Sequence, residues 1–184
     1  MKVLTFLTDG FETIEALAVV DVLRRADIEV KMVSISGDKC IKSAQNISVQ
    51  ADILIDDCDC DKDDVLFIPG GPGHKSYYEC DKLMDMLVKH NASGGRIAAI
   101  CAAPSVLGKL GILKGKNATC FPGFENMLEG ANCVAPDVRV VTDGNITTSR
   151  GMGTSMDLGL ELVRILAGEQ KADQLAHSTQ YKLL

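Results

Sequence analysis

Several features that mark large classes of proteins are missing from this sequence of 184 residues. It has no run of about eighteen apolar residues, which a membrane-spanning helix would need. The opening residues 1–9 become polar too soon for a secretory signal, so we predict a cytoplasmic protein. Basic residues number 19 against 25 acidic ones, and the formal net charge of −6 argues against nucleic acids or anionic membranes as partners. Small molecules are therefore the expected partners.

The sequence also lacks the motifs that hold metals, nucleotides or a disulfide framework. Its seven cysteines are an odd number scattered along the chain, and we expect mostly free thiols. Cys58 and Cys60 have a Cys-x-Cys spacing in an acidic stretch, but no second Cys or His pair lies nearby, so we interpret a solvated loop. No Walker motif and no dinucleotide fingerprint is present. We predict neither a metal nor a cofactor.

Apolar periodicity divides the chain into alternating strands and helices. Strands are predicted over residues 3–7, 28–35, 65–68, 96–100 and 117–120, with two short ones within residues 40–52. Helices are predicted over residues 12–26, 83–93, 154–167 and 169–177, with another beginning at Pro104. Asp143-Gly144 between residues 138–142 and 145–149 indicates a β-hairpin. Residues 1–184 therefore predict one α/β domain with a mostly parallel central sheet, helices on both faces and a late β-hairpin.

Cys101 occupies the position in this pattern that is best suited to chemistry. It lies between a buried strand and a helix whose first turn contains Pro104. A strand that turns sharply into a helix holds the side chain at the carboxyl edge of the sheet, where ligands bind in such folds. Free N–H groups and the helix dipole at this turn favour a thiolate. Cys101 is therefore a candidate nucleophile, although a buried cysteine is more often only a small hydrophobic residue.

Two carboxylates lie at the start of the first helix. Asp9 and Glu12 have the spacing of a capping box with Asp9 as the cap. Glu12 is equally well explained as a dipole partner of the helix. Glu15 is the better functional candidate, because a carboxylic acid kept protonated in a pocket can hydrogen-bond to a neighbouring thiolate.

Other candidates follow the remaining strands. Gly70-Gly71 after a strand is compatible with an oxyanion hole, and equally with an ordinary turn. His74 follows this pair and could serve as a general base, whereas His90 is expected to cap a helix C-terminus. Arg150 follows the hairpin and could hold an anionic substrate, although arginines that lie on the surface without such a role are more numerous.

Four ordered motifs that cover nearly the whole chain resemble the ThiJ/PfpI superfamily, and most closely its Parkinsonism-associated, protein-deglycase branch. They are the segments DGFETIEA at residues 9–16, FIPGG at 67–71, AAICAAP at 98–104 and TSRGMGTS at 148–155. The resemblance implies a flavodoxin-like sandwich and a homodimer. It identifies Cys101 as the reactive cysteine, Glu15 as its protonated hydrogen-bond partner, and the amides of Gly71 and Ala102 as the oxyanion hole.

The implied activity is that of a glyoxalase or deglycase that acts on methylglyoxal or glyoxal adducts without an added cofactor. Two alternatives stay open, a redox sensor or chaperone that signals through oxidation of Cys101, and an amide or acyl hydrolase. A Cys-His peptidase is not expected, because Ala102 stands where protease-like members have histidine. Phe121, before Pro122, and Gln45 also replace a histidine and a basic residue that some relatives carry.

Overall fold

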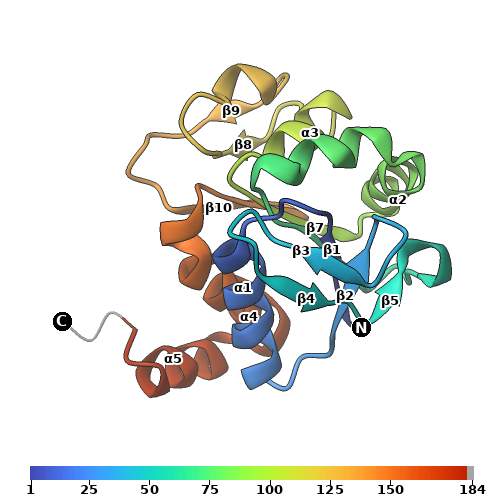
Figure 1. Ribbon diagram of the computed structural model, residues 1–184. Coiled ribbons are helices and arrows are strands. Elements are labelled where there is room, and N and C mark those ends of the chain that lie inside the picture. Colours follow the sequence, from blue (N-terminus) through green and yellow to red (C-terminus); the bar gives the residue numbers. More distant parts are fainter. Residues whose placement is uncertain (182–184) are drawn as a thin grey trace.

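The computed structural model describes residues 1–181 and shows a seven-stranded sheet between two helical layers (Figure 1). The strand order is β10-β11-β7-β6-β1-β2-β5, and every pairing is parallel except that of β10 with β11. The strands of this sheet are β1 (Val3–Leu7), β2 (Val30–Ser34), β5 (Ile53–Leu54), β6 (Val65–Ile68), β7 (Arg96–Ile100), β10 (Val140–Asp143) and β11 (Ile146–Ser149). The flavodoxin-like α/β prediction and its late antiparallel hairpin are confirmed.

Two small sheets lie outside the main one. They are formed by β3 (Cys40–Lys42) with β4 (Ser48–Gln50) and by β8 (Asn117–Ala118) with β9 (Asn132–Cys133). The helices are α1 (Thr13–Arg25), α2 (Asp81–Ala92), α3 (Pro104–Lys109), α4 (Ser155–Ala167) and α5 (Glu169–Ser178), and short 3-10 turns cover Ile55–Asp57, Pro72–Glu79, Glu125–Met127 and Met152–Thr154. Across residues 1–181, no helix combines the length and the apolar character needed to cross a bilayer.

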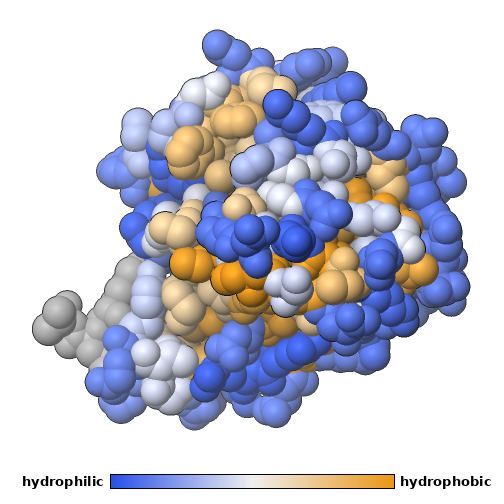
Figure 2. All heavy atoms as spheres, in the orientation of Figure 1, coloured by the Kyte–Doolittle hydropathy of each residue, from blue (hydrophilic) through white to orange (hydrophobic). Residues whose placement is uncertain are grey.

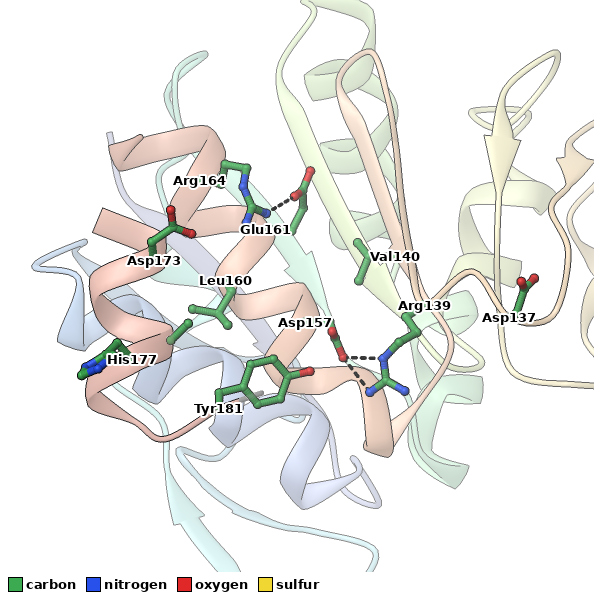
Figure 3. A pocket seen from close by; sticks show the side chains of 11 residues that line it. Asp137, Arg139, Val140, Asp157, Leu160, Glu161, Arg164, Asp173, His177 and Tyr181 are labelled. Carbon is green, nitrogen blue, oxygen red and sulfur yellow. Dashed lines mark hydrogen bonds and ion pairs between the residues drawn. The ribbon is translucent and has the colours of Figure 1, made fainter. Parts of the chain in front are cut away.

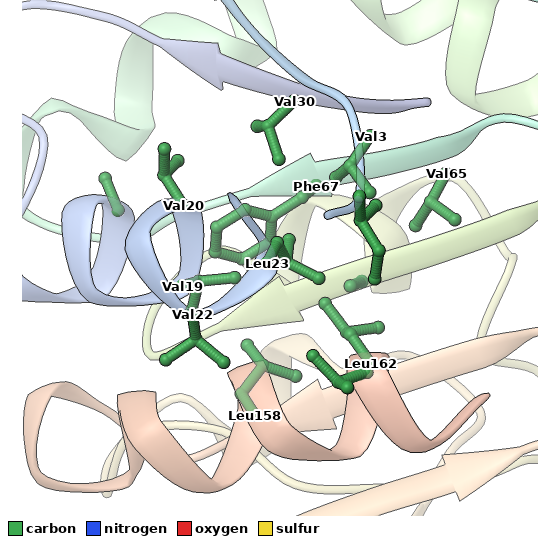
Figure 4. Packing of buried hydrophobic residues seen from close by; sticks show 14 of the residues in the cluster. Val3, Val19, Val20, Val22, Leu23, Val30, Val65, Phe67, Leu158 and Leu162 are labelled. Atoms are coloured by element: carbon green, nitrogen blue, oxygen red, sulfur yellow. The ribbon is translucent and has the colours of Figure 1, made fainter. Parts of the chain in front are cut away.

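The core has two halves, because alternate residues of each strand face opposite sides of the sheet. Val3 of β1 belongs to the half beneath α1, α4 and α5, whereas Leu4 belongs to the half beneath α2 and α3. Figure 4 shows the first half, where Val22 of α1 lies beside Leu158 of α4 in the same cluster as Phe67 of β6. The sheet is thus buried on both faces, as the continuous apolar strands predict.

Asp9 does not begin α1 as the capping-box prediction required. The N-cap is Glu12, whose carboxylate accepts a hydrogen bond from the Glu15 N–H at 2.7 Å. The Asp9 carboxylate instead accepts the N–H of Lys42 at 2.8 Å and so ties the end of β1 to the β3–β4 hairpin. The spacing was misleading because a carboxylate three residues further along offered the same capping chemistry.

A buried carboxylate, that of Asp64, stabilises the amino edge of the sheet, opposite to the carboxyl edge where Asp9 lies. Asp64, before β6, accepts the backbone N–H of Lys2 at 2.8 Å and that of Asp61 at 2.9 Å, and it pairs with the Lys2 ammonium at 3.0 Å. Burial would raise the pKa of Asp64, but these N–H groups and the ammonium outweigh it and hold the pKa below its usual value. Asp64 therefore stabilises the fold as an anion.

We expect Asp64→Asn to lower the free energy of unfolding at neutral pH by about 1–3 kcal/mol, because it leaves the Lys2 contacts weakened in a buried place. A lowered folded-state pKa adds stability above the unfolded pKa of about 3.9 and loses it as the pH falls through the folded value. Urea unfolding at several pH values should show the gap between variant and wild type closing in acid. Exposed Asp63 provides the matched control, and Asp63→Asn should change stability by less than about 0.5 kcal/mol.

Candidate functional site

Cys101 is the only residue of the turn between β7 and α3 with a positive φ, at +65°. A residue with a side chain is strained in this conformation, and such strain persists only where the surrounding structure imposes it. The Cys101 N–H donates to the Ser149 carbonyl of β11 at 3.0 Å, and the Cys101 carbonyl accepts the Phe121 N–H at 2.8 Å. Hydrogen bonds from two other segments therefore fix the cysteine at the carboxyl edge of the sheet.

The carboxyl group of Glu15 lies in hydrogen-bonding contact with the Cys101 thiol. Glu15 is 1% exposed and comes from the first turn of α1, which follows β1. Its Oε2 accepts the Gly70 N–H at 2.9 Å, and the Met152 N–H also donates to the carboxyl group. The strands β1, β6 and β7 are neighbours in the sheet, so their adjacent carboxyl ends bring these groups together.

Gly70 makes this contact possible because it has no side chain. A Cβ at this position would lie 2.7 Å from both the Cβ of Cys101 and the Oε2 of Glu15. The Gly70 carbonyl accepts the Glu12 N–H at 3.0 Å, which fixes the start of α1 against the end of β6. Glu12 therefore supports the site through its backbone N–H and as the cap of α1. Both roles are compatible with its interpretation as a dipole partner at the start of the helix.

Burial raises the pKa of the Glu15 carboxyl to about 7, despite the opposing hydrogen bonds from the thiol and two backbone N–H groups. Burial also raises the pKa of the Cys101 thiol, and the Glu15 carboxylate raises it further. The N–H groups of Ala102 and Gly71 face the sulfur and lower its pKa by less. The N–H groups at the turn therefore favour the thiolate, as expected, but burial and Glu15 outweigh them and the pKa of Cys101 is raised overall.

His74 and Arg150 lie beside this pair and have other partners. His74 is buried, and its Nδ1 donates to the Gly71 carbonyl at 2.9 Å, because a carbonyl can only accept. This bond fixes the residue whose N–H faces the sulfur. Arg150 donates to the Thr119 hydroxyl at 3.4 Å and borders a pocket of about 440 Å³. Gln45 is bound to Thr13, whose hydroxyl donates to it at 2.7 Å.

Sequence reasoning named residues 148–155 as a motif but did not foresee that the Met152 N–H of this segment donates to Glu15. Phe121 and Met152 line the same pocket as Arg150, and both side chains are about half exposed. A Cβ on Gly151 would lie 3.3 Å from the Phe121 ring and 3.8 Å from the Glu15 carboxyl, so this backbone lies directly against both. The signal in the sequence was the TSRGMGTS motif at residues 148–155, which follows a predicted strand.

Arg139 anchors that segment from the other side. Its guanidinium donates to the Asp157 carboxylate at 2.8 Å and to the Gly153 carbonyl, and Figure 3 shows the ion pair at the border of a second pocket between β10, α4 and α5. That pocket measures about 670 Å³, and neither Cys101 nor Glu15 lines it. The larger hollow is therefore separate from the Cys101 thiol.

Comparison with known proteins agrees with this geometry. Residues 1–165 match the model of the DJ-1/PfpI family. Protein dj-1beta of Drosophila melanogaster is 37% identical over 94% of this chain and 93% of its own length. The crystal structure of Drosophila melanogaster DJ-1beta is similar to this structure with a TM-score of 0.90. The match covers 98% of this chain and 99% of that chain, at 33% sequence identity. A Caenorhabditis elegans protein named glutathione-independent glyoxalase DJR-1.2 is 32% identical over 89% of this chain and 87% of its own length. The chain therefore belongs to the DJ-1/PfpI family.

Proposed function

We propose that the protein is a cysteine-dependent glyoxalase or deglycase that acts on methylglyoxal or glyoxal adducts without an added cofactor. The observation that carries this proposal is the contact of a buried carboxyl group with the Cys101 thiol at the carboxyl edge of the sheet. One relative is named a glutathione-independent glyoxalase, which supports the same activity.

The reaction begins with attack of the Cys101 sulfur on the aldehyde carbon, while the thiol proton passes to Glu15. The carbonyl oxygen becomes an alkoxide that the N–H groups of Gly71 and Ala102 stabilise, and it takes a proton to give a hemithioacetal. Glu15, having given the thiol proton to the alkoxide, then removes the proton on the carbon that bears sulfur and returns it to the neighbouring carbon. The hydroxyl proton of the first carbon moves to the oxygen of the second, which leaves a thioester. Water cleaves the thioester to lactate and restores the thiol. The net reaction adds one water to methylglyoxal.

His74 has a supporting position in this scheme. Its Nδ1–H donates a hydrogen bond to the Gly71 carbonyl. His74 therefore helps to position the Gly71 N–H, which is one of the two oxyanion donors. Glu15 is the group that contacts the sulfur, and we assign the proton transfers to it. Amide or acyl hydrolysis by a Cys-His pair has no comparable support at Cys101.

Replacement of Cys101 by Ser should lower kcat/KM for lactate formation from methylglyoxal by about a thousandfold or more, because the nucleophile is lost. The measurement is lactate released by the purified protein. Cys120→Ser is the matched control, since Cys120 is another free thiol on the neighbouring segment, more buried than Cys101 and outside the proposed chemistry. A wild-type protein that forms no lactate, or equal rates for wild type and Cys101→Ser, would refute the proposal.

The pKa of about 7 for Glu15 predicts how the reactivity of Cys101 depends on pH. Below this value both groups are protonated, and above it the carboxylate can accept the thiol proton. Alkylation of Cys101 by iodoacetamide should therefore rise through pH 7 and then level off.

Glu15→Gln should remove this inflection and slow alkylation at about pH 8 at least tenfold, because an amide cannot accept the proton. Glu12→Gln keeps a capping oxygen and should retain the inflection, moved slightly to lower pH, since the Glu12 charge helps to raise the pKa of Glu15. An inflection near pH 7 that survives in Glu15→Gln would contradict the assigned role.

A second candidate function, redox sensing, is favoured by the same N–H groups. Those of Gly71 and Ala102 face the sulfur and could equally donate to the oxygens of a sulfinate. Mild peroxide followed by peptide mapping separates the two functions. Selective oxidation of Cys101 without turnover of glyoxals favours the sensor, whereas random oxidation of several cysteines counts against it.

We also propose a homodimer formed through the face that carries α1 and the β3–β4 hairpin. Figure 2 shows apolar surface across the middle of this face, and Ile14 and Ile47 are 47% and 49% exposed there. Ile14→Asp should shift the mass measured by light scattering from twice the chain mass to the chain mass, since an interface buries such residues. Val88→Asp, at a similarly exposed position on α2, should leave the mass unchanged. A monomeric wild type would refute the dimer.

A further inference from the structure

The acidic segment of residues 56–64 is not the simple solvated loop that its composition predicts. Cys60 is half-buried, and its Sγ lies 3.5 Å from the Nδ1 of His90, a residue of α2 thirty positions away. The His90 side chain does not cap α2 as expected, because it turns toward the loop instead. Sequence spacing could not reveal this pair, since the packing of α2 against the loop creates it.

The environment of His90 determines which of its nitrogens can accept a proton. Nε2 lies 3.0 Å from the Asp64 carbonyl, and because a carbonyl only accepts, Nε2 carries the hydrogen. The neutral ring therefore presents the lone pair of Nδ1 to the Cys60 thiol. The ring is 5% exposed and lies so close to Gly95 that a Cβ there would collide with it. The imidazole is thus held in one orientation by its surroundings.

A pocket of about 350 Å³ opens onto this pair. Its wall contains Cys60, His90 and three lysines, Lys62, Lys82 and Lys89, against one carboxylate, Asp59. Lys82 also donates to the Asp56 carbonyl at 3.0 Å and lies 3.6 Å from the Asp56 carboxylate, and Lys89 lies 3.6 Å from that of Asp85. Both ion pairs are exposed, and such pairs contribute little free energy. The wall of the pocket is therefore suited to a thiol-reactive molecule that carries negative charge.

Burial, followed by the nearby charges of Asp64 and Cys58, raises the pKa of the Cys60 thiol to about 11. The sulfur is therefore neutral at rest and needs a base at the moment of attack. His90 is placed to be that base, with the Asp64 carbonyl as the group that orients it.

We propose that Cys60 is a second reactive thiol of this protein, which exchanges with small disulfides that carry carboxylates, and that His90 is its general base. The Cys60 sulfur attacks one sulfur of the disulfide, the old S–S bond breaks, and a mixed disulfide forms on Cys60. The thiol proton passes to His90 Nδ1 and then to the departing thiolate, which leaves as a thiol. Cys60 lies before the amino end of β6, at the opposite edge of the sheet from Cys101, so this site is independent of the proposed glyoxalase chemistry.

The test measures the rate of mixed-disulfide formation with glutathione disulfide by peptide mapping on the whole folded chain. Cys40 is exposed and serves as the reference thiol within each molecule. We expect Cys60 to react faster than Cys40 in the native protein and to lose this advantage in urea. His90→Gln retains an N–H donor for the Asp64 carbonyl and should slow Cys60 about tenfold or more while Cys40 is unchanged.

Two further arms test the charge and the fold. Lys82→Glu with Lys89→Glu should slow the reaction of Cys60 with glutathione disulfide but not with the uncharged reagent methyl methanethiosulfonate, whereas His90→Gln should slow both. Cystamine, a cationic disulfide, should react more slowly than glutathione disulfide in the wild type.

Unfolding temperatures show whether the variants are folded, and His90→Asn provides a second variant if His90→Gln does not fold. The proposal is overturned if Cys60 and Cys40 form mixed disulfides at equal rates, or if Cys58 is modified instead of Cys60. It is also overturned if a folded His90 variant leaves the rate at Cys60 unchanged, or if glutathione disulfide and cystamine react at equal rates.

Discussion

The candidate site depends on the close approach of the end of β6 to two side chains. Gly70 has no Cβ, so its backbone can lie against Cys101 and donate to Glu15 while its carbonyl receives the N–H of Glu12. One residue thereby sets the distance between β7, which carries the thiol, and α1, which carries the acid. The pKa values of both groups follow from this distance and from the burial that comes with it.

The surrounding backbone makes that approach rigid. Cys101 is held at a positive φ by hydrogen bonds to Ser149 and Phe121, which belong to segments far apart in the sequence. The segment after β11 is itself tied to Arg139 and places the Met152 N–H on Glu15. The reactive groups are therefore positioned mainly by main-chain atoms, which move less than side chains do.

Regular periodicity allowed most of the fold to be predicted, because continuous apolar strands can be buried only between two helical layers. The contact of Glu15 with Cys101 was expected from the resemblance, and the place of Cys101 at the carboxyl edge of the sheet was expected from the strand that turns into a helix there. Three features could not be predicted. Asp9 and Glu12 are both able to cap α1, and the spacing did not show which of them does. The direction of the Cys101 pKa shift depended on burial. The contact of His90 with Cys60 depended on packing between distant elements.

The edge of the main sheet at β5 has a consequence for how chains can associate. An unpaired strand edge is a template for another strand, but β5 has only two residues and gives way at once to a turn that contains Asp56 and Asp57. A second chain would find few backbone groups to pair with there and would meet negative charge. Growth of the sheet from chain to chain is thus blocked on this side, which protects a protein with an otherwise continuous apolar sheet from aggregation.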